Sequence, residues 1–130
     1  MSKILVVDDS PDIRLALTTV LEEAGYETVE ASDGTEVLGS ILQHCPDIVL
    51  LDLAMPRKDG FSALLEVKKD NRVKNTPVIM VTAKGRPEDL TRSRSLGAQD
   101  YINKPWEDGE VELRVGWVLD EAGINVQLAS

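Results

Sequence analysis

The sequence predicts an α/β fold in which five buried parallel strands alternate with five helices. Three apolar runs of four residues, at 4–7, 48–51 and 78–81, lack the polar alternation of a half-exposed strand. Unbroken runs of this kind are typical of strands that helices cover on both faces, as in a parallel sheet. Parallel neighbours need crossover connections, and amphipathic segments of helical length follow the runs. The sequence therefore predicts a doubly wound domain.

The first helix is well marked, because Ser10 can cap its start, Pro11 suits its first turn and Gly25 can end it. Its inward face is predicted to consist of Ile13, Leu17, Val20, Leu21 and Ala24. Residues 26–30 are then predicted to form the second strand. A second helix is predicted over residues 35–43. Its inward residues are predicted to be Val37, Leu38, Ile41 and Leu42.

The second half of the chain repeats this alternation. A third helix is predicted to start at Asp59-Gly60, with a shared face of Phe61, Leu64, Leu65 and Lys68. The fourth, over about 87–96, has only Leu90 and Leu96 as strong apolar anchors and precedes a strand at 100–103. The last helix is predicted over 108–121, with Val111, Val115, Val118, Leu119 and Ala122 inward. Leu113 and Trp117 then point away from the core.

Composition indicates one ordinary globular domain. The 130 residues include 14 Lys and Arg against 23 Asp and Glu, a formal net charge of −9. This balance argues against direct binding of nucleic acid, because phosphate contacts need clustered Lys and Arg. No stretch has the ~18 apolar residues of a membrane span, so no membrane partner is expected. We expect a domain over residues 1–122 and a C-terminal tail over 123–130.

Cys45 is the only cysteine, so an intrachain disulfide or a cysteine-cluster metal site is excluded. Such cysteine usage is consistent with a reducing compartment, and cytoplasmic residence is the expectation. We expect Cys45 to be a buried structural thiol.

Polar side chains follow the predicted strands where each strand ends. Asp8 and Asp9 follow the first strand, Asp52 follows the third, Thr82 ends the fourth and Lys104 follows the fifth. The carboxyl ends of parallel strands line one edge of a sheet, where ligands bind. Three carboxylates crowded there repel one another, and a hard divalent cation such as Mg²⁺ relieves that repulsion. Each residue alone also fits a cap, a turn or a surface charge, but together they predict one ligand site.

Four motifs stand in order at these strand ends, namely Val6–Asp9, Asp52–Gly60, Val81–Ala83 and Leu96–Trp106. On these motifs the chain, over residues 3 to about 120, resembles the receiver domain of a bacterial two-component response regulator of the chemotaxis-regulator type. The resemblance implies a flavodoxin-like sheet with strand order 2-1-3-4-5.

The resemblance also implies a metal-dependent phosphoacceptor. Asp52 would take a phosphoryl group from a phosphohistidine and become an aspartyl phosphate. Asp9 and Asp52 would coordinate Mg²⁺ or Mn²⁺ directly, Asp8 through a water, and Ala54 through its backbone carbonyl. Such a domain catalyses only its own phosphorylation and dephosphorylation, so it is not expected to be an enzyme with an external substrate.

Further roles follow from the same resemblance. Lys104 and Thr82 would contact the phosphoryl oxygens, with the backbone N–H of Ala83 as a second donor. Thr82 and Tyr101 would form a conformational switch, and the peptide before Pro105 would be cis. Tyr101 also fits a half-buried strand residue without a function.

Two positions are expected to tune the lifetime of the phosphoryl group. Ala54 lies two residues after Asp52, and Lys84 lies two residues after Thr82. The resemblance implies that their side chains would overhang the phosphoryl group. Small Ala54 cannot orient a water, and Lys84 could obstruct one, so slow self-dephosphorylation is the expectation.

Two other classes of function fit these residues less well. A phosphatase of the haloacid-dehalogenase type also forms an aspartyl phosphate, but it needs a second Asp where this chain has Ala54. A nucleotide-binding module needs a Gly-rich loop after the first strand, where this chain has the acidic segment 8–11.

The expected partners are a sensor histidine kinase or histidine phosphotransfer protein and a downstream protein target or fused output domain. A phosphorylation-dependent homodimer is a further expectation. Leu113 and Trp117 are candidates for an apolar contact with a partner or a second copy, although Trp117 also fits a residue that packs on its own chain. The sequence leaves open whether the domain acts alone or belongs to a longer regulator.

Overall fold

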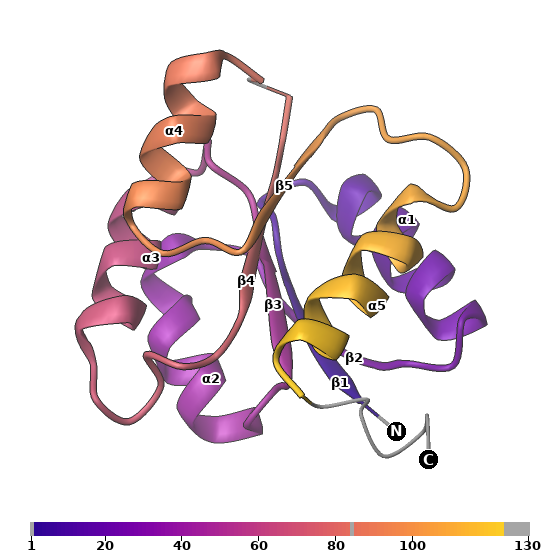
Figure 1. Cartoon of the computed structure of the whole chain (residues 1–130), viewed down its shortest axis with the longest axis horizontal. Helices are drawn as coiled ribbons and strands as arrows, with labels where there is room; N and C mark the ends of the chain where they lie inside the picture. Colours follow the sequence, from indigo (N-terminus) through magenta and orange to yellow (C-terminus); the bar gives the residue numbers. More distant parts are fainter. Residues whose placement is uncertain (1, 84, 124–130) are drawn as a thin grey trace.

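Five parallel strands form one sheet in the order β2-β1-β3-β4-β5, as predicted (Figure 1). The structure is a computed structural model, which describes residues 2–83 and 85–123. Its strands are β1 (Lys3–Val7), β2 (Glu27–Ala31), β3 (Ile48–Leu51), β4 (Val78–Thr82) and β5 (Asp100–Asn103). The strands lie within one or two residues of the positions predicted from the apolar runs.

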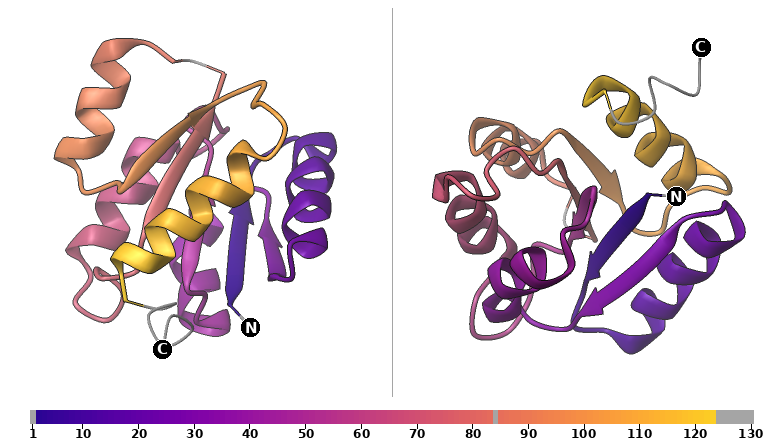
Figure 2. Two further views of the ribbon diagram at one scale, coloured as in Figure 1. Left: turned by 45° about the vertical axis from the view of Figure 1, so that its right-hand side comes forward. Right: turned by 90° about the horizontal axis from the view of Figure 1, so that it is seen from below.

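Helices cross over between the strands and cover both faces of the sheet. They are α1 (Pro11–Glu23), α2 (Val37–His44), α3 (Gly60–Lys69), α4 (Pro87–Ser95) and α5 (Glu110–Glu121), with a short 3-10 helix η1 (Gly34–Glu36) before α2. Helices α1 and α5 pack on one face, and α2, α3 and α4 lie on the other (Figures 1 and 2). None of the described helices is long and apolar enough to cross a membrane.

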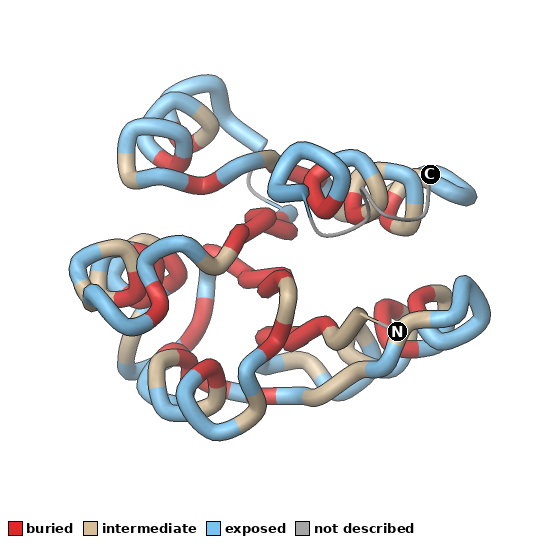
Figure 3. Tube along the Cα trace, turned by 60° about the horizontal axis from the view of Figure 1, so that its bottom comes forward, coloured by how far each residue is buried: buried red, intermediate tan, exposed pale blue. Residues whose placement is uncertain are grey.

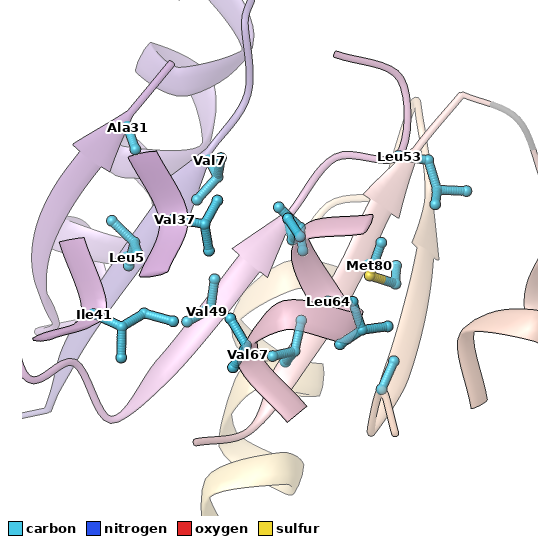
Figure 4. Close-up of a cluster of buried hydrophobic side chains, with 14 of the residues drawn as sticks. Leu5, Val7, Ala31, Val37, Ile41, Val49, Leu53, Leu64, Val67 and Met80 are labelled. Atoms are coloured by element: carbon cyan, nitrogen blue, oxygen red, sulfur yellow. The ribbon is translucent and has the colours of Figure 1, made fainter. Parts of the chain in front are cut away.

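Side chains of the central strands point alternately into two apolar cores. Leu5 and Val7 belong to the core beneath α2 and α3, whereas Ile4 and Val6 belong to the core beneath α1 and α5. Figure 4 shows the first core, where Val37 and Ile41 of α2 meet the strand residues. Because both faces are covered, the central strands are buried along their length, as the red segments in Figure 3 show.

The predicted helix caps are present. Ser10 Oγ accepts a hydrogen bond from the Ile13 amide at 3.3 Å, and Pro11 begins α1. Asp59 Oδ1 accepts from the Ser62 amide at 2.8 Å and so caps α3. Gly25, just beyond α1, has a φ of +97°, a conformation that favours glycine.

The prediction that certain apolar residues face the core was wrong. Leu42 and Leu65 are exposed, because they flank the narrow buried stripes of α2 and α3. Ala24 and Ala122 are exposed as well, since each is the residue that caps the end of its helix.

The Cys45 thiol is exposed, which corrects the prediction of a buried thiol. Cys45 follows the last residue of α2 with a left-handed backbone, φ 50°, and its amide donates to the Ile41 carbonyl at 2.9 Å. The chain turns there toward β3, which leaves the side chain at the surface. The division between a domain at 1–122 and a tail stays a prediction, because Lys84 and residues 124–130 lie outside the described residues.

Candidate functional site

Three carboxylates meet at the carboxyl edge of the sheet. Asp8 follows β1 and Asp52 follows β3, and these strands pair in parallel with Val7 opposite Leu51. A carboxylate oxygen from each of Asp8, Asp9 and Asp52 lies within 4.8 Å of the others. Asp8 and Asp52 are buried, while Asp9 is exposed. The cluster therefore opens to solvent on the side of Asp9.

The ammonium group of Lys104 lies against the two buried carboxylates. Lys104 Nζ is 2.5 Å from Asp8 Oδ2 and 3.5 Å from Asp52 Oδ2. Its backbone amide donates to the Thr82 carbonyl at 2.9 Å, and the peptide that joins it to Pro105 is cis, as predicted. Among the described residues, Lys104 is paired with two of the three carboxylates, so their charge is only partly balanced.

The electrostatics of Asp52 reflect this partial balance. Burial raises the pKa of Asp52 above its ordinary value, and the charge of Asp8 raises the same pKa further. The charge of Lys104 and hydrogen bonds from Lys104 and the Ala54 amide oppose that rise. Oxygen donors with uncompensated negative charge are the ligands that Mg²⁺ and Mn²⁺ prefer. The donor set therefore fits a hard divalent cation.

Thr82 and Tyr101 lie on the two strands beside this cluster. Met80 pairs with Leu51 on one side and with Tyr101 on the other, so β4 brings Thr82 to the sheet edge next to Asp52. Both side chains are buried and have contacts within the domain. Burial raises the pKa of Tyr101, and the charge of Asp89 on α4 raises it as well.

Ala54 borders an open cleft of about 540 Å³ between the β3–α3 loop and α4. Residues that line it include Asp9, Ala54, Met55, Phe61, Arg86 and Arg92. The Ala54 amide is 3.5 Å from Asp52 Oδ1. Its methyl side chain offers no acid–base group, so the second carboxylate of a dehalogenase-type phosphatase is missing at this position. Ala83 follows β4 and is exposed, and its predicted role as a backbone donor stays a prediction.

Three interactions around the site were missed by the sequence reasoning. Arg57 pairs with the buried carboxylate of Asp33, which joins the β2–α2 and β3–α3 loops. The pKa of Asp33 is lowered, first by the hydrogen bond from the Thr35 amide and then by Arg57. Asp33 before a helix start is a capping signal that the sequence did contain.

The other two missed interactions involve α4. Arg86 Nε donates to Asp89 Oδ2 at 3.2 Å, and the Arg92 guanidinium lies 4.2 Å from the centre of the Phe61 ring. The Arg92–Phe61 contact depends on how α4 packs against the start of α3, which no local pattern specifies. Arg86 and Asp89 are three residues apart at the start of α4, a spacing that could have indicated their pairing.

Comparison with known proteins gives consistent relatives. The family model for the response regulator receiver domain matches residues 4–116. The chain is 37% identical over 119 residues to the DNA-binding dual master transcriptional regulator RpaA of Synechocystis sp., covering 92% of this chain and 49% of that protein. It is 36% identical over 117 residues to the phosphate regulon transcriptional regulatory protein PhoB of Escherichia coli, covering 90% of this chain and 51% of PhoB.

A solved structure agrees with these relatives. The chemotaxis response regulator CheY4 of Vibrio cholerae superimposes with a TM-score of 0.85 at 33% identity, over 92% of this chain and 99% of CheY4. The chain thus spans about half the length of the two transcriptional regulators and nearly the whole of the chemotaxis protein.

Proposed function

Because this chain belongs to the response regulator receiver domain family, we propose that Asp52 is the residue that accepts the phosphoryl group. The observation that carries the proposal is the cluster of Asp8, Asp9 and Asp52 within 4.8 Å, with Lys104 against it. The donor is a phosphohistidine on a sensor histidine kinase or a histidine phosphotransfer protein.

The transfer moves one phosphoryl group between two side chains. A carboxylate oxygen of Asp52 forms a bond to phosphorus while the bond from phosphorus to the histidine nitrogen breaks, and the imidazole keeps that electron pair. Asp9, Asp52 and the Ala54 carbonyl would hold Mg²⁺ or Mn²⁺, with Asp8 assisting through a water. The bound ion would supply positive charge beside the transferring group. The Lys104 ammonium group leaves its contact with Asp52 and binds a phosphoryl oxygen. It thereby supplies a second positive charge to the transferring group.

Metal-dependent labelling tests this proposal directly. The protein is incubated with acetyl phosphate and Mg²⁺ at neutral pH, and intact mass is recorded. We expect the mass of one phosphoryl group to be added, and we expect a parallel reaction with excess EDTA to show none of it. Labelling that proceeds equally in EDTA, or no labelling in Mg²⁺ by acetyl phosphate and phosphoramidate alike, would contradict the proposed role of the acidic cluster.

Thr82 is proposed to couple phosphorylation to a change around α4. Thr82 is the last residue of β4, the strand between β3, which Asp52 follows, and β5, which carries Tyr101. A hydrogen bond to a charged group contributes about 1.5–3 kcal/mol, which shifts a two-state equilibrium by about tenfold or more. Rearrangement of Thr82 toward the phosphoryl group would therefore be sufficient to change the position of Tyr101 and the neighbouring helix.

Substitution Thr82→Ala is expected to leave phosphorylation intact but to remove this coupling. In the wild type, beryllofluoride with Mg²⁺ should alter hydrogen exchange mainly between residues 85 and 103, and Thr82→Ala should lose most of that change. Thr19→Ala, at an exposed position of α1, serves as the control and should respond as the wild type does. An unaltered response in Thr82→Ala would remove Thr82 from the switch.

The output partner is proposed to contact α5. Leu113 and Trp117 are exposed there, as predicted. They lie beside the acidic residues Glu107 and Asp108 and beside Arg114, which pairs with Glu110 at 3.0 Å. An apolar surface with an acidic border suits a partner that offers apolar and basic groups. Since the two transcriptional regulators are about twice as long as this chain, a fused output domain is one such partner. A phosphorylation-dependent homodimer stays a prediction.

A further inference from the structure

A charged pair joins two loops at the edge of the sheet where the carboxylates meet. Asp33 precedes η1 in the β2–α2 loop, and Arg57 lies in the loop between β3 and α3. The Asp33 side chain is only 2% exposed, while the Arg57 side chain lies over it from the surface and is 74% exposed. Both Nε and the terminal guanidinium nitrogen of Arg57 contact Asp33 Oδ2. Asp33 Oδ1 accepts from the Thr35 amide at 2.8 Å, so both carboxylate oxygens have partners.

The two loops are also pressed together through their backbones. A Cβ atom on Gly34 would lie 2.0 Å from the Lys58 carbonyl oxygen, so no side chain fits at that contact. Gly34 follows Asp33 directly, and Lys58 follows Arg57 directly. The charged pair and the glycine contact therefore hold the same two segments against each other.

Arg57 lies on a loop that is closed at its base and is attached to α3 by the pair of Lys58 with Glu66 at 2.7 Å. The Gly60 amide donates to the Leu53 carbonyl at 2.8 Å and closes the loop there, and Met55 is buried in the core. Between these points the Lys58 amide donates to the Pro56 carbonyl at 2.7 Å, and Arg57 has a positive φ of 66°. An Arg at positive φ is an uncommon conformation that needs support from its surroundings. The contact with Asp33 supplies such support to the outer part of the loop.

We propose that Arg57 is a positioning residue for the metal site, acting through Asp33 to fix the loop that carries the Ala54 carbonyl. This inference rests on the proposed function, because Ala54 is a metal ligand only in that proposal. The position of a carbonyl ligand is fixed only by the backbone that carries it. A mobile loop must therefore lose conformational freedom when the ion binds, and this entropic cost weakens the binding. Arg57 and Asp33 reduce that freedom before the ion arrives.

The expected change in Mg²⁺ affinity is opposite to the change that the loss of a positive charge alone would cause. Arg57→Gln removes a positive charge near the site, which by itself would tighten the binding of a cation. We expect weaker binding instead, with the half-saturating Mg²⁺ concentration raised roughly threefold to tenfold, at or below the range for groups that orient metal ligands. Asp33→Asn should have a similar effect, and the double variant should add little to either single variant, because both break the same contact.

The test is a Mg²⁺ titration followed by the NMR shifts of the Asp9, Asp52 and Ala54 amides. Lys58→Gln is the matched control, because Lys58 lies on the same loop but pairs with Glu66 of α3 at 2.7 Å and makes no side-chain bond to the β2–α2 loop. This control should keep the wild-type affinity or bind slightly more tightly. Arg57→Lys, which keeps the charge, should recover part of the affinity lost in Arg57→Gln.

A second measurement needs no metal. Without Mg²⁺, and at a temperature where both proteins are folded, the amide of Lys58 should exchange faster with solvent in Arg57→Gln than in the wild type. Failure of the wild type to bind Mg²⁺ would overturn the proposed metal site itself. If the wild type binds but Arg57→Gln binds equally well, or Lys58→Gln is weakened as much, only the positioning role of Arg57 is overturned.

Discussion

Asp52→Asn is expected to abolish the addition of a phosphoryl group from acetyl phosphate in the presence of Mg²⁺. The amide has no anionic oxygen to attack phosphorus, and it also removes one carboxylate from the three that lie within 4.8 Å. Intact mass after incubation measures the loss. Asp59→Asn is the control, because Asp59 lies on the same loop and caps α3. This substitution should weaken the helix cap only in part and should leave labelling intact. Full labelling of Asp52→Asn would assign the phosphoryl group to another residue.

The same variant is expected to stabilise the metal-free protein at neutral pH. The folded-state pKa of Asp52 is raised by burial and by Asp8, so the folded protein holds this proton more tightly than the unfolded chain does. The protonated Asp52 carboxyl therefore makes its full contribution to the free energy of unfolding below about pH 4. That contribution is lost as pH rises through the folded-state pKa. Thermal melts should show Asp52→Asn above the wild type at pH 7, with the difference disappearing near pH 4. A lower melting temperature at pH 7 would mean that Lys104 outweighs burial and Asp8.

Lys104→Met is expected to lower the free energy of unfolding of the metal-free protein by about 2–4 kcal/mol. The ammonium group is the cation in contact with Asp8 and Asp52, and its side chain is only 14% exposed. Removing it leaves two buried carboxylates without that charge. Urea unfolding at pH 7 measures the loss, and Mg²⁺ should restore part of it by binding the folded state.

Lys3→Met is the matched control for that experiment. Lys3 pairs with Glu27 at 3.5 Å, and the two side chains are 31% and 53% exposed. Exposed pairs contribute about 0–1 kcal/mol, so this control should lose much less stability and gain nothing from Mg²⁺. Equal losses in both variants would show that the environment of Lys104 is no more demanding than that of a surface lysine.

The strands and the position of the site could be predicted because each depends on short, local patterns. Runs such as 48–51 are apolar without interruption, and parallel strands necessarily end at a common edge. The meeting of Asp8, Asp52 and Lys104 at that edge also depends on the strand order, which the family resemblance implied. Its distances and the burial of the carboxylates did not follow, since they depend on side-chain packing.

The pairing of Asp33 with Arg57 was beyond the sequence for a related reason. The residues are 24 positions apart in two irregular loops, and no periodic pattern relates them. The exposure of Leu42 and Cys45 was missed because the end of a helix and the width of its buried face depend on neighbouring helices. Lys84, predicted to influence the lifetime of the phosphoryl group, lies outside the described residues, and that role stays a prediction.

The way in which α4 is attached has a consequence for the solubility of a signalling state. Its buried positions are Asp89 and Ser93, and Ser93 Oγ donates to the Asp89 carbonyl at 2.8 Å within the helix. Arg92 against Phe61 adds a cation–π contact, and Leu90 and Leu96 are only partly buried. On displacement, α4 itself would therefore expose few apolar side chains, which would contribute only a small change in heat capacity. A shift of this helix would therefore not require its own side chains to form a large exposed apolar patch, the kind of surface that favours aggregation.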